Sequence, residues 1–502
     1  MGVIKDWDFF WHNRHDFHLG SLATEMPHIN TIGLAETANE SVDKAIDMIR
    51  DVDLEMLHKL KNFQPQAMAL STQIRQVLSA GGRIFISGCG ATGRLAIVLE
   101  KLWRLEVNDK NKDCVIGFMA GGDAALVKSI EGFEDHPEYA GAHIKELGFG
   151  EKDLLLAVTE GGETPFVLAT VEAALKISRQ MPWLIYCNSD HSLRSVRRSW
   201  DLISNSGVRS ISLETGSMAL TGSTRMQATT AQMLFIASAL FEVDLQNEIN
   251  NLIDVLHAVD QKMQASLIET EAHTYKQGGY ISYICDHVNG LTVLTDTTER
   301  APTFSLTPFE NVFGDDRPCL CYLIVEDAQT TEAAWNKILG RLPRTLEWSF
   351  CCSNTGLERL YGFDISKATL TRRQRYNNHL LFSIKADNGI YSLDLQHQHL
   401  NLDGRKLSLS GAQALLKIIL NTHSTLVAAL LGRYQSNIMS YVSPANNKLI
   451  DRAIRYVQYL LAQNHQNDIA YDEIALMLYK VSLDMPPTDS IVIHTYEALC
   501  RR

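Results

Sequence analysis

The sequence predicts an α/β protein with two successive doubly wound parallel sheets, each covered by helices on both faces, and a helical cap at the C-terminal end. Three observations support this prediction. Short apolar segments alternate with helical segments from residue 83 to about residue 243. A glycine-rich turn joins the first strand to its helix, and the second half repeats the arrangement more loosely. Such alternation is typical of parallel sheets.

The first half contains five predicted strands. Each is a short, mostly apolar run bounded by residues that favour turns or helix starts. Helices fit between the strands, and a long helix is predicted from about Thr224 to Val243. The predicted strands are Arg83–Ser87, Cys114–Met119, Asp153–Val158, Trp183–Cys187 and Ser210–Leu213.

The second half contains an internal echo of the first. Thr230–Leu234 resembles Gly411–Leu415, about 180 residues further on, and each stands near the start of a long apolar helix. A period of that size predicts duplication of a whole domain. We therefore expect an N-terminal extension (1–50), two sheet domains (51–250 and 251–445) and a helical cap (446–502). The second-half strands are predicted at Tyr280–Cys285, Leu291–Leu294, Cys319–Val325 and Leu380–Ile384.

Composition excludes several classes of function. The net charge of −12 and the lack of a basic run argue against nucleic-acid binding. No apolar run reaches about 18 residues, so no membrane span is expected, and the N-terminus lacks a signal-peptide layout. Nine scattered cysteines without metal-ligand spacing favour reduced thiols. We expect a cytoplasmic protein with no metal and no cofactor.

The turn Gly88–Arg94, with the sequence Gly-Cys-Gly-Ala-Thr-Gly-Arg, is the strongest local signal. Glycines between a strand and a helix let backbone N–H groups approach an anion, and the helix N-terminus adds partial positive charge. The spacing is neither a Rossmann fingerprint nor a P-loop. The turn predicts a phosphate cradle, with an ordinary strand-to-helix turn as the alternative.

Other polar loops follow predicted strands. Ala120–Asp123 leads to Glu131–Asp135, Thr159–Phe166 follows the third strand, and Thr221–Met226 precedes the long helix. The carboxyl ends of parallel strands meet at one edge of a sheet, where ligands bind. Small hydroxyl residues and glycines there suit a phosphate or sugar, although each loop alone could be a helix cap.

These segments resemble two protein families. IFISGCGATGRLAIVLE, AGGDAALVKSIEGFEDHPEYAG, TPFVLA and LTGSTRMQATTAQ are similar to the N-acetylmuramic acid 6-phosphate etherases and equally to the glucokinase regulatory proteins, both of the sugar isomerase (SIS) group. The resemblance spans residues 83–243 and continues more weakly afterwards, as in the two-SIS-domain regulators. It implies two tandem flavodoxin-like SIS domains that bind phosphosugars without a nucleotide.

The resemblance also implies site residues. Glu134 matches the etherase general base, with Glu131 in the same motif. Glu299, in Asp296–Thr303, fits the pattern Asp-x-x-Glu-x-Pro-Pro-Thr that carries a second acid. Lys448, in Asn446-Asn447-Lys448-Leu449, matches a lysine that contacts phosphate. The remaining ligand-binding positions on the matching loops are Gly90, Ala91, Thr92, Gly93, Thr159, Glu160, Gly161 and Ser223.

The two halves have lost complementary parts of this pattern. The first half keeps the phosphate loops and Glu134 but has Leu102 near the position of the second acid. The second half keeps Glu299 and Lys448, but its loop Cys285–Gly290 has one glycine and an aspartate. A duplicated and fused homodimer could retain one composite site in this way. The alternative is that Glu299 and Lys448 are solvated surface charges.

Two glutamates depart from the family pattern. Glu160 and Glu163 place carboxylates on a loop that should face phosphate, where like charges repel. Either a cation such as Arg94, Arg225 or Lys448 intervenes, or the glutamates face sugar hydroxyls.

Two functions follow from the resemblance. A lyase would use Glu134 to take the C2 proton and Glu299, with a raised pKa, to protonate the leaving lactyl ether oxygen. A sensor would use both glutamates to bind sugar hydroxyls. We expect a regulatory or sensing role in carbohydrate metabolism, because the two-domain layout resembles the regulators.

The expected ligands are fructose 6-phosphate, fructose 1-phosphate or N-acetylmuramic acid 6-phosphate. About 54 residues follow Lys448, a short cap for kinase docking, so a kinase partner is not favoured; self-association stays open.

Overall fold

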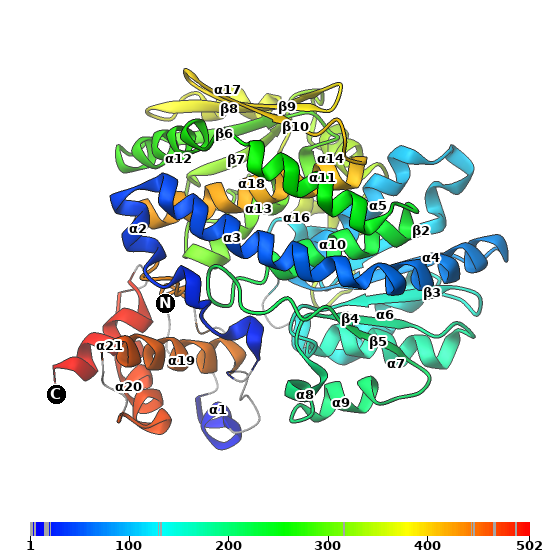
Figure 1. Cartoon of the computed structure of the whole chain (residues 1–502), viewed down its shortest axis with the longest axis horizontal. Coiled ribbons are helices and arrows are strands. Elements are labelled where there is room, and N and C mark those ends of the chain that lie inside the picture. Colours follow the sequence, from blue (N-terminus) through cyan, green and yellow to red (C-terminus); the bar gives the residue numbers. More distant parts are fainter. Residues whose placement is uncertain are drawn as a thin grey trace.

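The computed structural model confirms the α/β class. It describes residues 4, 7–14, 20, 22–128, 130, 133–314, 317–442, 444, 447–464, 468–486 and 489–501, with the side chains of 13 and 448 left out. Figure 1 shows a two-part α/β body with a helical cap at one corner, beside the N-terminal segment.

The first half is built around a parallel sheet in the strand order β2-β1-β3-β4-β5. All five predicted strands overlap these strands. They are β1 (Ile84–Gly88), β2 (Val115–Met119), β3 (Leu154–Val158), β4 (Trp183–Tyr186) and β5 (Arg209–Ser212). The helices of this half are α5 (Gly90–Glu106), α6 (Pro137–Glu146), α7 (Pro165–Ile177), α8 (Asp190–Leu193), α9 (Arg197–Ile203) and α10 (Gln227–Leu240).

Both faces of the first sheet are buried. Ile84 and Ile86 belong to a core that includes α5 and α10, whereas Phe85 belongs to a second core with α6 and α7. Successive side chains of a strand point to opposite faces, so a strand covered on both sides is apolar throughout. This burial explains why the first-half strands were predictable as continuous apolar runs.

The second half has a mixed sheet in the order β10-β9-β8-β6-β7. β6 is parallel to both β7 and β8, and β9 and β10 continue as an antiparallel meander. The strands are β6 (Tyr280–Cys285), β7 (Cys321–Val325), β8 (His379–Asp387), β9 (Ile390–Leu395) and β10 (Gln398–Asp403). The helices are α11 (Leu245–Ala258), α12 (Gln261–Lys276), α13 (Gly290–Phe304), α14 (Thr331–Leu339), α15 (Cys352–Thr355), α16 (Leu357–Tyr361), α17 (Ala368–Arg373) and α18 (Leu409–Leu430).

The prediction of a strand at Leu291–Leu294 was wrong. These residues lie in the first turns of α13, and all four of their side chains are buried. A short apolar run fits a buried helix as well as a strand, so periodicity alone could not separate the two.

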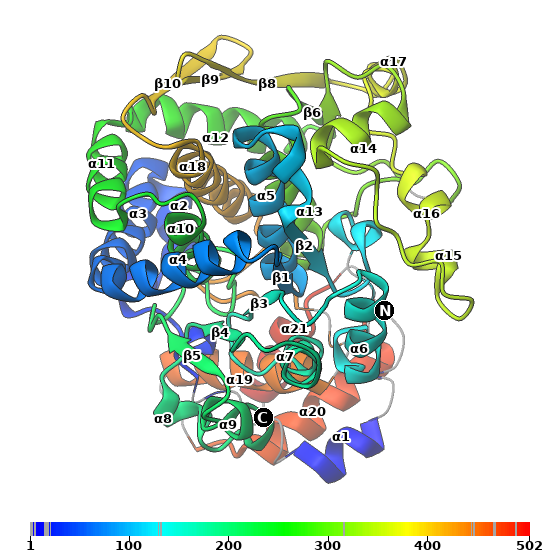
Figure 2. The same cartoon turned by 90° about the vertical axis from the view of Figure 1, so that its right-hand side faces the viewer.

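The two echo segments lie in helices that pack together. Thr230–Leu234 is in α10 and Gly411–Leu415 is in α18, and these helices contact each other at the centre of the molecule (Figure 2). The helix α3 (Val42–Leu60) contacts both. The helix α2 (Leu34–Glu40) packs on α3 and α18, and α4 (Gln64–Ser79) packs on α10. The junction of the halves is therefore a helical layer with a shared core.

The cap consists of α19 (Asn447–Gln463), α20 (Tyr471–Asp484) and α21 (Ile491–Cys500). The N-terminal helix α1 (Trp7–Asn13) packs on it, with the Trp7 ring stacked 4.5 Å from the Tyr479 ring. Leu460 and Leu461 are buried, whereas Leu476 is 52% exposed. Across the residues that the structure describes, none of the helices has the length and apolarity needed to span a membrane.

Candidate functional site

A cavity of about 580 Å³ lies where the two halves and the cap meet. Its walls come from the loops after β1, β2 and β3, from the loop before α10, from α13 and from α19. The lining residues are Cys89, Gly90, Ala91, Arg94, Val127, Lys128, Glu134, Glu160, Thr164, Gly222, Ser223, Thr224, Arg225, Thr298, Glu299, Ala301, Pro302, Thr303, Ser305, Leu306, Pro308, Met439, Val442, Leu449 and Arg452.

Size alone does not identify this cavity as the site. Two open hollows of about 610 and 670 Å³ lie elsewhere on the molecule. Neither is lined by any residue that the sequence singled out for binding or catalysis. The cavity at the junction is distinguished instead by its position at the carboxyl ends of the first-sheet strands, where ligands of this fold class bind.

The glycine-rich turn forms one wall. Gly90 has φ = +53°, a left-handed conformation that glycine adopts without a Cβ penalty, and it begins α5. Gly90 and Ala91 both line the cavity. The first N–H groups of a helix have no intrahelical acceptor, and the helix N-terminus carries partial positive charge. This wall can therefore receive an anion.

Thr92 and Gly93 do not line the cavity. The Thr92 hydroxyl accepts from the Cys89 N–H at 3.0 Å and donates to the Cys89 carbonyl at 2.9 Å, so it caps the start of α5. A Cβ at Gly93 would lie 2.4 Å from the Met119 Cβ, so this glycine allows α5 to pack on β2. Both residues shape the turn.

In the loop after β3, some of the predicted ligand-binding residues line the cavity and others do not. Glu160 lines the cavity and accepts from the hydroxyls of Thr224 at 3.3 Å and Thr229 at 3.4 Å. Thr159 and Gly161 do not line it. The Thr159 hydroxyl bonds the Thr164 hydroxyl at 3.0 Å, and the Gly161 carbonyl accepts from Asn188 Nδ2 at 3.0 Å, so both hold the loop.

Glu163 does not present a free carboxylate to a bound phosphate, because it forms an ion pair with Arg198. Its carboxylate is 3% exposed and accepts from Arg198 Nη2 at 2.6 Å. Arg198 Nε also donates to the Glu163 carbonyl at 2.8 Å. Arg198 lies 35 residues away, and none of the cations considered from the sequence supplies this contact.

Ser223 projects an unused hydroxyl. Its side chain is 4% exposed, lines the cavity, and its Oγ has no hydrogen-bond partner. A buried polar atom without a partner is costly, and a ligand could satisfy it. Its position at the cavity wall and its lack of a partner make it a candidate donor or acceptor for a bound group.

The second half holds the loop that carries Ser223. Lys417 of α18 donates to the carbonyls of Arg225 at 2.6 Å and Met226 at 3.3 Å. Burial lowers the pKa of Lys417 to about 7. The Arg225 guanidinium bonds Asp296 Oδ1 and Asn421 Oδ1, each at 3.1 Å, and burial lowers its pKa.

The two predicted catalytic glutamates line the same cavity, from opposite halves. Glu134 lies in the short turn η8 (Phe133–Asp135), and Cys89 Sγ lies 3.2 Å from its Oε2. Glu299 lies in α13 and forms an ion pair with Arg94 of α5. Glu131, the neighbour of Glu134 in the same motif, lies outside the described residues.

The cap closes the cavity from the other side. Leu449 and Arg452 of α19 line it, while the side chain of the predicted ligand Lys448 lies outside the described residues. Arg452 forms a two-point ion pair with Glu25, at 2.7 and 2.9 Å, and this carboxylate raises its pKa. Tyr456 donates to the Thr221 carbonyl at 2.9 Å.

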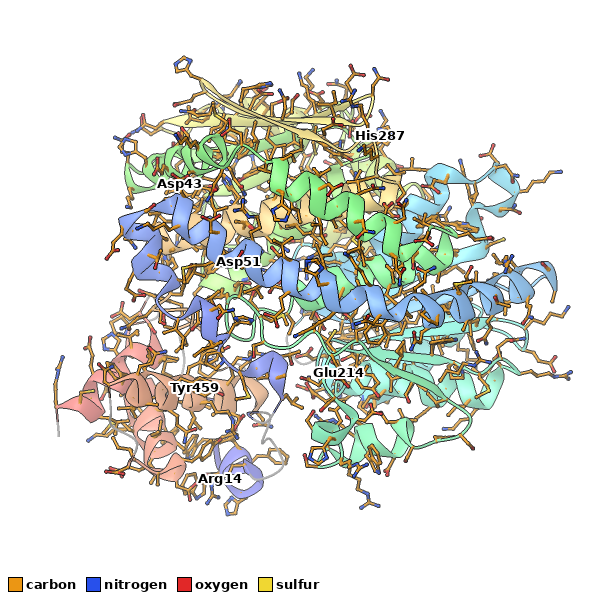
Figure 3. The ribbon with its side chains drawn as sticks, viewed as in Figure 1. Arg14, Asp43, Asp51, Glu214, His287 and Tyr459 are labelled. Carbon is orange, nitrogen blue, oxygen red and sulfur yellow. The ribbon has the colours of Figure 1, made fainter. Side chains whose placement is uncertain are left out.

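The corresponding loop of the second half contains its own anion. Asp286 Oδ1 accepts from the N–H groups of Val288 at 3.0 Å and Asn289 at 2.9 Å, and from Asn289 Nδ2 at 3.1 Å. His287, labelled in Figure 3, lies far from the cap that carries Tyr459. The N–H groups in the turn before α13 therefore already donate to an internal carboxylate, whereas the corresponding turn of the first half, before α5, lines the cavity.

Sequence reasoning missed two features of the cavity. Cys89 stood inside the quoted motif, but nothing in the pattern indicated that its thiol meets Glu134. Glu25, 427 residues before Arg452, had no sequence signal at all. No group of three or more His, Cys, Asp or Glu side chains in the described part of the chain is arranged to hold a metal ion.

Comparisons with known proteins find related sequences. The family model for the glucokinase regulatory protein N-terminal SIS domain matches residues 67–175. The N-acetylmuramic acid 6-phosphate etherase of an Exiguobacterium species is 31% identical over 222 residues, which make up 43% of this chain and 69% of the relative. The etherase of Aliivibrio fischeri strain MJ11 is 29% identical over 204 residues, or 40% of this chain. The chain spans 64% of the length of this second relative.

Solved structures also match this chain, and among them is one whose match covers most of both chains. It is the C-terminal domain of glucosamine-fructose-6-phosphate aminotransferase from Francisella tularensis, with 13% identity and a TM-score of 0.36. The match covers 75% of this chain and 96% of that chain.

Proposed function

This chain belongs to the SIS domain family, as a protein of the etherase-like type, and from that membership we propose that it binds a phosphorylated sugar at one composite site between its halves. One observation carries the proposal. The Gly90 turn, Ser223 and Glu134 of the first half line the same cavity as Glu299 of the second half.

The phosphate would bind to the first-half wall. The N-terminus of α5 offers backbone N–H groups, and the unused Ser223 hydroxyl lies in the same cavity. The three arginines in the described lining already face carboxylates: Arg94 pairs with Glu299, Arg225 with Asp296 and Arg452 with Glu25. Lys128 is a further cationic side chain of the described lining, so it can bind the anion together with the backbone and hydroxyl donors.

The sugar would lie against the carboxylates. Glu134 and Glu160 line the cavity, and a carboxylate accepts hydrogen bonds from sugar hydroxyls. This division, with donors for the phosphate and acceptors for the ring, supports a hexose or amino-sugar phosphate. Fructose 6-phosphate, fructose 1-phosphate and N-acetylmuramic acid 6-phosphate are the candidates.

We favour a regulatory or sensing role in carbohydrate metabolism over catalysis. A lyase would need Glu299 to hold a proton and give it to the leaving oxygen. In the structure the Glu299 carboxylate instead contacts the guanidinium of Arg94, which is 1% exposed. This contact already engages Glu299, which supports a role in holding a ligand.

The lyase is the second candidate function. It is supported by the presence of Glu134 and Glu299 in one cavity and by the etherase relatives. In that case Arg94 would have to release Glu299 when the substrate enters. A kinase partner is not part of either proposal: Leu460, Leu461 and Leu478 are buried inside the cap, and Leu476 and Leu483 are its exposed leucines among the described residues.

Ligand-induced thermal stabilisation, combined with a lactate assay, tests the proposal. A ligand at one hundred times its Kd stabilises the folded state by about 2.7 kcal/mol. We expect at least one of the three sugar phosphates to raise the Tm, unphosphorylated fructose to leave it unchanged, and N-acetylmuramic acid 6-phosphate to release no lactate. Lactate release that Glu134→Gln abolishes would establish the lyase instead. No shift with any of the three would reject the site.

A further inference from the structure

Cys89 stands between the phosphate wall and Glu134. It is the residue immediately before α5, and its Sγ lies 3.2 Å from Glu134 Oε2. A thiol donates through its S–H, and a carboxylate oxygen accepts. The contact joins the residue that begins the anion-binding turn to the carboxylate that faces the sugar.

The position of the thiol is fixed by the backbone. The Thr92 hydroxyl bonds both the N–H and the carbonyl of Cys89, at 3.0 and 2.9 Å. Cys89 therefore has little freedom to move away from the start of α5. Its side chain lines the cavity together with the unpartnered hydroxyl of Ser223.

Glu134 has a less constrained backbone. It lies in a three-residue turn, η8, which cannot hold a side chain as a long helix does. Its neighbour Phe133 is 4% exposed and stacks 6.0 Å from the ring of Trp348, which anchors the turn itself. The direction of the Glu134 carboxylate is then set by what its oxygens contact.

We propose that Cys89 is a positioning residue for the sugar-binding carboxylate. Its S–H donates to Glu134 Oε2 and directs the other oxygen toward the ring hydroxyls of the ligand. This inference rests on the proposed function, because it requires a sugar phosphate in the cavity. It adds that sugar recognition and phosphate recognition are joined through one side chain at the start of α5.

Two substitutions test the role of the thiol. Cys89→Ala removes the donor, together with the contact of the thiol with the Thr92 N–H at the start of α5, and Cys89→Ser replaces the thiol with a hydroxyl. Both keep the bonds between the Cys89 backbone and the Thr92 hydroxyl. A cysteine S–H is a weak donor, so the loss of this bond should weaken binding about as much as the loss of an ordinary hydrogen bond, about five- to tenfold. We expect Cys89→Ala to raise the Kd for fructose 6-phosphate by that factor and Cys89→Ser to restore most of the affinity. Cys352→Ala, at an exposed cysteine, is the matched control and should leave the Kd unchanged.

A double-mutant cycle separates positioning from a general structural effect. In a Glu134→Gln background, Cys89→Ala should have little further effect on fructose 6-phosphate binding, because the carboxylate it directs is gone. Binding of inorganic phosphate should be the same in wild type and Cys89→Ala. Equal loss of sugar-phosphate and inorganic-phosphate binding, or full additivity with Glu134→Gln, would overturn the inference.

The two proposals can fail separately. If the wild type binds none of the three sugar phosphates, the proposed function is wrong. If the wild type binds fructose 6-phosphate and Cys89→Ala binds it equally well, only the role of Cys89 is wrong. Titration calorimetry on the full chain measures all of these values, and the Tm of each unliganded variant reports its folding.

Discussion

Arg94 and Glu299, 205 residues apart in the sequence, form an ion pair that joins the two halves at the wall of the cavity. Arg94 also donates to the carbonyl of Leu126 at 2.9 Å and to that of Ala125 at 3.3 Å. Its guanidinium is thereby fixed on the first half while it faces α13 of the second. The site and the junction of the halves share this contact.

Removing Arg94 should destabilise the protein strongly. Arg94→Met leaves Glu299 without its cation in a largely buried position, which costs about 3 kcal/mol. Glu299→Gln in the Arg94→Met background should recover part of that loss, because it removes the uncompensated charge. Urea unfolding of the two single variants and the double variant measures the coupling energy. Additive losses would show that the two residues do not interact.

Ser223→Ala should leave stability nearly unchanged and weaken ligand binding. The Ser223 hydroxyl has no partner in the protein, so its removal breaks no internal bond. Its loss would remove one donor to the bound anion and reduce the ligand-induced rise in Tm. Thr92→Val is the matched contrast: loss of its cap at α5 should cost about 1 kcal/mol without ligand. A normal ligand response in Ser223→Ala would count against its role.

Asp286 should stabilise the second half as an internal anion. Its Oδ1 accepts three hydrogen bonds in the turn before α13. Asp286→Ala should cost about 1–2 kcal/mol, and Asp286→Asn should cost less because its amide oxygen still accepts. Chemical denaturation compares the two. Equal losses in both variants would mean that the acceptor geometry is not the source of the stabilisation.

His143 should make the protein sensitive to acid. Burial lowers its pKa to about 4, from an ordinary value of 6.5, and its ring packs 5.0 Å from that of Phe118. Above pH 6.5 the ring is neutral in both the folded and unfolded states. As the pH falls toward 4, the unfolded chain binds the proton first, so the folded state loses about 3 kcal/mol.

His143→Phe tests this pH dependence. The variant should lose about 3 kcal/mol less than the wild type between pH 7 and pH 4, measured as the free energy of unfolding in urea. His191→Phe, at an exposed histidine, is the control and should follow the wild type. A parallel decline of wild type and His143→Phe would show that His143 is not the group responsible.

The sequence was sufficient for the first sheet and insufficient for the edge of the second. The first-sheet strands are buried on both faces and read as apolar runs. β9 and β10 expose alternate side chains and were missed, although Asn388-Gly389, with φ of +48° and +79°, is a hairpin signal. The cap was predicted, but its contact with the N-terminal segment through Glu25 and Arg452 was not.

The sequence predicted which segments meet at the candidate site, but it did not predict which of their side chains face the cavity. The motifs brought Gly90, Glu134, Ser223 and Glu299 to one cavity, because strand ends of a parallel sheet meet at one edge. Which side chains face that cavity depends on hydrogen bonds that a motif does not show. The Thr92 hydroxyl, for example, bonds the Cys89 backbone at the start of α5 and does not line the cavity.

Calorimetric titration with the tightest-binding of the three sugar phosphates tests the composite site most directly, in the wild type, Ser223→Ala and Glu299→Gln. The stoichiometry should be one ligand per chain, because the loop before α13 is occupied by Asp286. Both variants should bind more weakly than the wild type, one through the first half and one through the second. Two ligands per chain, or unchanged affinity in Glu299→Gln with an intact fold, would contradict a single site shared by the two halves.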